Sequence, residues 1–146
     1  MRPTTLTQNA YAPPATEGIQ MWRSRTAKFT VHWGRSGAVI TVRGEIDAAN
    51  ATAFAQHTER LVQRCEWLVI DLSELEFIGI EGFSALQEIN TACTNIRAEI
   101  KVIPGPALRA VSRICDPYAR LPLADSLTEA LAEVQQPGRP PLRLVP

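Results

Sequence analysis

The hydrophobic pattern between Lys28 and Gln135 is the feature that most constrains the fold, because its period changes regularly along the chain. Alternating or continuous apolar residues predict strands, and apolar residues spaced by three and four predict helices. Strands are predicted over 29–33, 38–42, 67–72, 100–103 and 121–123, and helices over 48–64 and from 81, 106 and 126. This β-β-α-β-α-β-α-β-α order predicts an α/β fold, with a mixed sheet and helices packed against it.

Local signals at the ends of these segments support the assignment. The stretch 34–37 begins and ends with glycine and predicts a hairpin loop. Asp47 is placed to cap the first helix, and Pro106 fits the first turn of the third. Ser126 and Glu129 have the spacing of a capping box for the last helix.

The length of 146 residues predicts one domain. Of the eleven prolines, three lie within 1–14 and four within 137–146. We therefore expect a flexible N-terminal tail over 1–27, a folded domain over 28–135 and a flexible Pro-rich tail over 136–146. The stretch 137–141 is either a docking segment or part of a solvated tail.

The charge balance argues against nucleic acid as the main ligand. The chain has 15 Lys+Arg and 15 Asp+Glu residues, whereas nucleic-acid binders usually carry a basic excess. The first twenty residues lack the apolar region of a signal peptide, and no apolar run approaches the length of a membrane-spanning helix. We expect a cytoplasmic protein that is not inserted in a membrane.

The three cysteines, Cys65, Cys93 and Cys115, are widely spaced and form no CxxC pair. This pattern predicts neither a disulfide framework nor a zinc site. They are either reduced, mostly buried thiols, or include a Cys93–Cys115 redox pair between neighbouring helices. No metal or cofactor is expected.

Catalytic residue sets are also scarce. The two histidines, His32 and His57, fall on different predicted elements, and both are interpreted as surface residues. Glu74 and Glu76 are more typical of a solvated connection than of an acid/base pair. The stretch 79–82 lacks the Lys and hydroxyl of a phosphate-binding P-loop. These observations favour a protein-binding function over an enzyme.

One long segment, 71–82, leads from a buried strand directly to a helix N-terminus. Such a connection presents free N–H groups and the positive end of a helix dipole, which suit a phosphate or a carboxylate. From the spacing alone, however, an ordinary strand-to-helix connection is the preferred interpretation. Asp71 can satisfy backbone N–H groups of its own turn.

Two stretches carry a family resemblance. Val42-Arg-Gly-Glu-Ile-Asp47 resembles "hydrophobic-x-Gly-Glu-Leu-Asp", and the segment 71–82 resembles "Asp-Leu-Ser-x-Val-x-Phe-Ile-Asp-Ser-Ser-Gly". Both patterns, in this order, are similar to the STAS domain family of bacterial anti-sigma factor antagonists, and the resemblance covers 28–135. It implies a kinase-like anti-sigma factor as partner. In the family, that partner phosphorylates a loop serine, and the added charge weakens the complex.

The chain departs from the family pattern at this serine. In the resemblance, Gly79 aligns with the loop aspartate, Ile80 with the phosphoacceptor and Glu81 with the following Ser/Thr, while Gly82 is retained. Isoleucine has no hydroxyl, so the family's phosphorylation cannot occur at residue 80.

Several alternatives stay open at this loop. Glu81 places a permanent carboxylate at the helix N-terminus, which is a weak imitation of phosphate; alternatively, Ile80 supplies an apolar contact for constitutive binding. Ser84 is either a helix-surface serine or a displaced phosphosite. Asp47 caps a helix, shapes the partner-binding end, or does both.

The resemblance favours an anti-sigma factor antagonist-like regulator that lacks the serine switch. The alternative is a STAS-type accessory subunit of a membrane lipid transport complex, and a small-molecule sensor is a third possibility. We expect a monomer or a weak homodimer.

Overall fold

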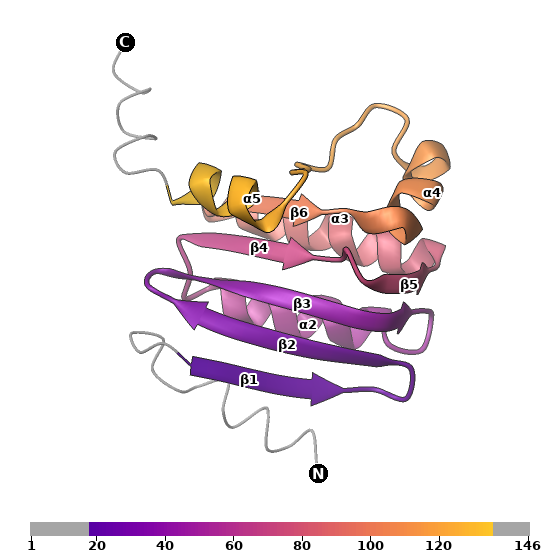
Figure 1. Ribbon diagram of the computed structural model, residues 1–146, viewed down its shortest axis with the longest axis horizontal. Helices are drawn as coiled ribbons and strands as arrows, with labels where there is room; N and C mark the ends of the chain where they lie inside the picture. Colours follow the sequence, from indigo (N-terminus) through magenta and orange to yellow (C-terminus); the bar gives the residue numbers. More distant parts are fainter. Residues whose placement is uncertain (1–17, 136–146) are drawn as a thin grey trace.

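A six-stranded mixed sheet forms the centre of the computed structural model, which describes residues 18–135 (Figure 1). The strands are β1 Gly18–Arg23, β2 Ala27–Gly34, β3 Gly37–Ile46, β4 Trp67–Asp71, β5 Leu75–Ile78 and β6 Glu99–Ile103. The helices are α2 Ala51–Val62, α3 Ile80–Asn95, α4 Gly105–Cys115 and α5 Leu127–Val134. The α/β fold class expected from the sequence is confirmed.

The order across the sheet is β1-β2-β3-β4-β6, and β5 pairs with the end of β3. The first three strands form an antiparallel meander, whereas β3, β4 and β6 pair in parallel. Parallel neighbours need crossover connections, and α2 and α3 provide them. The predicted hairpin loop is confirmed, because Gly34 ends β2 and Gly37 begins β3.

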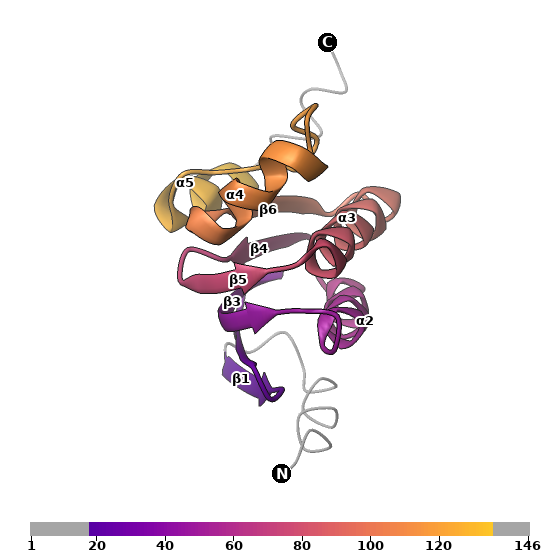
Figure 2. The same ribbon diagram turned by 90° about the vertical axis from the view of Figure 1, so that its right-hand side faces the viewer.

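The helices cover the sheet unequally. Figure 2 shows α2 and α3 side by side on one face, and α5 on the opposite face. The larger apolar core lies beneath α2 and α3 and includes Phe29, Phe54, Leu86 and Ile89. A smaller core, which includes Val69 and Ala130, lies between α5 and strands β4 and β6. Burial of β4 from both sides agrees with its continuous apolar sequence.

The prediction of a flexible N-terminal tail is wrong over residues 18–27. Residues 18–23 form β1, an edge strand that pairs antiparallel with β2. Its anchor is Trp22, which stacks on Phe29 with ring centroids 4.5 Å apart. Most other side chains of the strand are exposed, so its sequence resembles that of a solvated segment. The tails expected over 1–17 and 136–146, including 137–141, lie outside the described residues.

Two further elements differ from the prediction. Residues 75–78, expected as a connection, form β5, which pairs in parallel with β3 across a register shift at Gly44/Glu45. The predicted strand over 121–123 is reduced to an isolated bridge between Leu123 and Val102, next to β6. Pro122 has no N–H to extend the pairing.

Candidate partner-binding surface

Residues 79–82, which align with the phosphorylated loop of the family, form the N-terminus of α3. The backbone N–H of Gly79 donates to the carbonyl of Ile46 at 3.0 Å, which fastens the start of the helix to the end of β3. The N–H of Phe83 donates to the carbonyl of Gly79 at 3.0 Å and closes the first helical turn. The structure thus places Gly79, Ile80, Glu81 and Gly82 in one turn at the end of the sheet.

Two large apolar side chains are exposed beside this turn. Ile80 is 66% exposed, and Phe77, at the preceding strand, is 48% exposed. Between them, Ile78 is buried and anchors the segment in the core. The Phe77 ring lies alongside Gly79, because its edge would be 3.6 Å from a Cβ at that position. Phe77 and Ile80 therefore form an apolar tip at the start of α3.

Gly82 allows α3 to approach the sheet closely. A Cβ at this position would lie 2.6 Å from Cγ1 of Ile78 and 2.8 Å from Cγ2 of Ile46, which is too close for packed carbon atoms. A larger residue would push the helix away from the strand end that fixes the loop. The glycine retained in the family pattern thus has a packing role here.

Glu81 lies in the first turn of α3, and its Oε1 is 3.0 Å from the position of a Cβ at Gly79. The carboxylate therefore folds back toward the helix N-terminus, where negative charge is favourable by about 0.3–1 kcal/mol. Residues 79–82 carry no hydroxyl. Ser84 is exposed on the next part of the helix and faces the space between α2 and α3.

Asp47 does not cap α2 in the predicted way. The helix begins at Ala51, and Asn50 occupies the N-cap position. Oδ1 of Asp47 accepts from the N–H groups of Ala49 (3.0 Å) and Asn50 (3.2 Å), so the side chain stabilises the turn before the helix. Residues 48–50, which were expected to belong to the helix, form this turn instead. Oδ2 of Asp47 also accepts from the Thr26 hydroxyl at 3.3 Å.

Asn50 is a buried polar residue that the sequence analysis missed. It is 4% exposed. Its Nδ2 donates to the carbonyl of Glu45 (2.9 Å) and to the hydroxyls of Ser24 (3.0 Å) and Thr26 (3.2 Å). Its Oδ1 accepts from the N–H of Asp47 at 2.9 Å. Because a buried polar group is tolerated only when it is satisfied, this network fixes the β1–β2 turn against the end of β3.

No local sequence signal identifies this network, because its members are up to 26 positions apart. Asp71 behaves as predicted: its Oδ1 accepts from the N–H of Ser73 at 3.0 Å, within its own turn. Glu74 pairs with Arg43 at 2.8 Å on the surface.

A groove of about 410 Å³ extends from this surface between α2 and α3. Ala48, Ile80 and Glu81 line its end nearest the apolar tip, and Ser84 and Glu88 line it further along. The predicted partner-binding residues therefore adjoin a second surface feature that the sequence did not indicate.

The remaining candidate residues lie away from the turn. Burial raises the pKa of Cys65 and of Cys93 to about 12, so both stay protonated thiols near neutral pH. Cys115 is half-buried at the end of α4.

His32 is exposed, as predicted. His57 is more covered than the predicted surface position implies: it is half-buried, with its ring centroid 4.7 Å from that of Trp22. Within residues 18–135, no helix has the length and apolar character needed to cross a bilayer.

Comparison with known proteins gives consistent results. The STAS domain model matches residues 31–130. Osmosensory protein A of Mycobacterium tuberculosis is 31% identical over 100 residues, which cover 66% of this chain. The match spans 63% of that relative, less than two thirds of its length.

Solved structures of similar fold include anti-sigma factor antagonists. The one from Mycobacterium paratuberculosis is 26% identical and has a TM-score of 0.62, covering 84% of this chain and 97% of that chain. The antagonist SpoIIAA in its unphosphorylated form is 15% identical, with a TM-score of 0.58 over 81% of this chain and 96% of that chain. SpoIIAA of Bacillus in its phosphorylated form is also 15% identical, with a TM-score of 0.55 over 80% of this chain and 99% of that chain.

At 15% identity, SpoIIAA supports only the likeness of fold, whereas the domain model matches most of the described residues in sequence. The chain belongs to the STAS domain family.

Proposed function

We propose that this chain is a regulatory protein of the anti-sigma factor antagonist type, which binds an anti-sigma factor of the kinase-like class in the cytoplasm. The binding surface is the apolar tip of Phe77 and Ile80. The observation that carries the proposal is the 66% exposure of Ile80 at the start of α3. Neighbouring exposed apolar side chains, unlike single ones, mark protein interaction sites, because their desolvation favours association.

Because Ile80 stands at the position of the family's phosphorylated serine, the proposed function includes no serine switch. A phosphoserine would add about −1.5 to −2 charges at the centre of the surface. Ile80 has no group that accepts a phosphoryl group, and the carboxylate of Glu81 is a smaller, permanent charge beside it. Binding is therefore constitutive at this loop, and any regulation acts elsewhere.

The proposal is tested by exposing the chain to its isolated kinase-type partner with Mg-ATP. The intact mass of the unmodified chain is expected to stay constant. Ile80→Ser restores the hydroxyl at an exposed position and is expected to gain the mass of one phosphoryl group. Phosphorylation of the unmodified chain at residues 79–84 would overturn the proposal.

A second candidate is an accessory subunit of a membrane lipid transport complex. The lack of a hydroxyl at Ile80 favours it, since such a subunit needs no phosphorylation switch. The two candidates predict different partners in a purification from the native cell. A sigma regulator supports the first, and a transport ATPase subunit supports the second.

A further inference from the structure

A long groove follows the seam between α2 and α3, away from the sheet. Its first part, of about 410 Å³, begins at Ile80, and a second part of about 540 Å³ continues toward Asn95. The two parts share Glu59, Ser84 and Glu88, so they form one continuous feature. α3 has 16 residues, and the groove therefore extends for roughly 24 Å along it.

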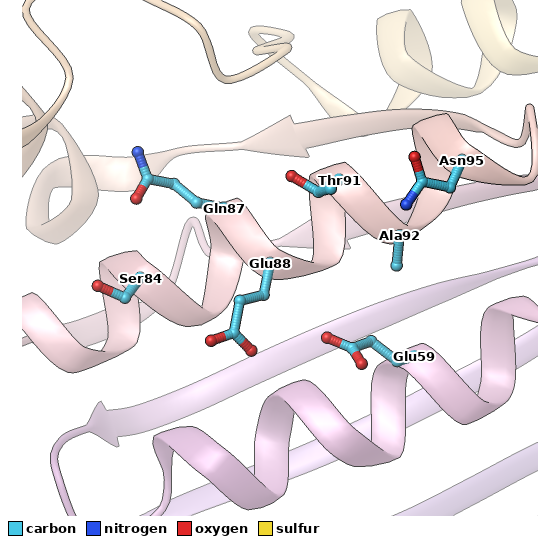
Figure 3. Close-up of a pocket in the computed structure, with 7 residues that line it drawn as sticks. All are labelled: Glu59, Ser84, Gln87, Glu88, Thr91, Ala92 and Asn95. Carbon is cyan, nitrogen blue, oxygen red and sulfur yellow. The ribbon is translucent and has the colours of Figure 1, made fainter.

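The lining of this groove combines small side chains with carboxylates. The exposed Ala48 lines the first part and the half-buried Ala92 the second, so another backbone can come close at these points. Ala51 and Ala85 also line the first part, but they are themselves buried. Figure 3 shows Glu88 reaching from α3, and Glu59 from α2, into the space between the two helices. Glu81 adds a third carboxylate at the Ile80 end.

These carboxylates are not neutralised within the described part of the chain. No Lys or Arg lines either part of the groove. The described residues provide no ion pair for Glu59, Glu81 or Glu88, whereas Glu74 and Glu133 do have cationic partners. Like charges that face one groove repel each other, and a cation placed between them lowers that energy.

A metal ion is not the cation that this groove fits. Within residues 18–135, no three His, Cys, Asp or Glu side chains are close enough together to hold one. Divalent ions need several ligands at short distance, whereas Arg and Lys side chains pair with separate carboxylates along a surface.

We infer that the groove binds an amphipathic helix of the partner that carries Arg or Lys on its inward face. The inference rests on the proposed function, because it extends the apolar tip along α3. A helix fits the length of the groove, and small lining residues permit close helix packing. Its cations would pair with Glu59 and Glu88, and an apolar residue near its end would contact Ile80.

Site-specific photo-crosslinking in the native cell tests this inference. The photoreactive residue p-benzoylphenylalanine replaces Thr91 in the groove, Ile80 at the tip or, as a control, Glu66 after α2. Thr91 and Glu66 are both exposed, and Glu66 does not line the groove. We expect Thr91 and Ile80 to capture the same protein, with the Thr91 crosslink on a segment whose Arg or Lys residues recur at spacings of three and four.

The outcomes separate the two proposals. Capture at Ile80 but not at Thr91 would overturn the groove and leave the proposed function intact. Capture at Thr91 alone would support the groove and overturn the tip, and capture at neither would overturn both. A crosslinked segment without cationic residues would contradict the inference.

Charge reversal provides a second readout with the isolated partner. Glu88→Lys is expected to weaken binding about fivefold or more at low salt, because it puts a cation where the partner supplies one. Glu66→Lys, the matched change of an exposed glutamate outside the groove, is expected to change affinity less than about twofold. Equal effects of the two variants would overturn the inference.

Discussion

At the scale of single residues, Gly44 explains part of the motif that marks the family. Its φ of +95° lies in the left-handed region, which side chains with a Cβ rarely adopt. A Cβ there would also overlap the carbonyl oxygen of Thr26. That carbonyl accepts from the N–H of Glu45 at 2.9 Å. The glycine therefore permits the β1–β2 turn to lie against β3.

Replacement of this glycine is expected to be costly. Gly44→Ala should lower the free energy of unfolding by at least about 2 kcal/mol, because it combines backbone strain with overlap. Gly18→Ala is the control, since a Cβ at Gly18 meets nothing within 4 Å. Urea unfolding of both variants measures the difference, and equal stability would refute this account of the turn.

The cysteines are expected to differ in their reactivity toward alkylating reagents. With pKa values of about 12, Cys65 and Cys93 have a thiolate fraction of roughly 10⁻⁴ at pH 8. We expect iodoacetamide to label Cys115 first in the folded chain and the other two only on unfolding, as read by peptide mass. Labelling of Cys93 as fast as that of Cys115 would contradict this. The Cys93–Cys115 redox pair stays a hypothesis that intact mass after mild oxidation can test.

At the scale of elements, an aromatic column joins β1 to α2. Trp22 stacks on Phe29, and the ring centroid of Phe29 lies 5.4 Å from that of Phe54. The ring of His57 of α2 also lies against Trp22, with centroids 4.7 Å apart and the planes tilted by 38°. Burial, and secondarily the charge of Arg60, lowers the pKa of His57 below its ordinary value. The column therefore favours neutral histidine.

This arrangement predicts a pH dependence of stability. In the unfolded chain His57 has an ordinary pKa near 6.5, so between that value and its lower folded pKa the unfolded state binds more protons. The free energy of unfolding should fall as the pH drops from about 7.5 through about 6. His57→Phe keeps the ring and should lose this slope, while His32 is present in both chains. An unchanged slope in His57→Phe would contradict the prediction.

Elements were predictable where the sequence pattern decided their burial. The strand β4 and the helix α5 follow from a continuous apolar run and from a capping box, and Oγ of Ser126 does accept from the N–H of Glu129 at 3.1 Å. β1 and β5 are stabilised instead by pairing with β2 and β3, which lie elsewhere in the chain. Pairing between distant segments leaves little local signal, so these strands were missed.

At the scale of the whole molecule, the start of α3 could be predicted from the sequence, but the hydrogen-bond network and the groove around it could not. The segment 71–82 identified the helix start and the missing hydroxyl at Ile80 from residues adjacent in sequence. The Asn50 network and the groove join side chains of different elements, so they depend on how α2 and α3 pack. Such features become visible only when the fold is known.

The exposed apolar tip at Ile80 is the proposed contact with a protein partner. Its most direct test is the dissociation constant for the isolated partner of two matched variants, Ile80→Asp and Ile19→Asp. Ile80 and Ile19 are 66% and 65% exposed, so both changes remove equal apolar surface, but Ile19 lies on the edge strand β1.

Ile80→Asp is expected to raise the dissociation constant by about tenfold or more, because an apolar contact at the interface is lost, whereas Ile19→Asp should change it less than about twofold. Unchanged affinity of Ile80→Asp, or an equal loss in Ile19→Asp, would contradict the proposed contact.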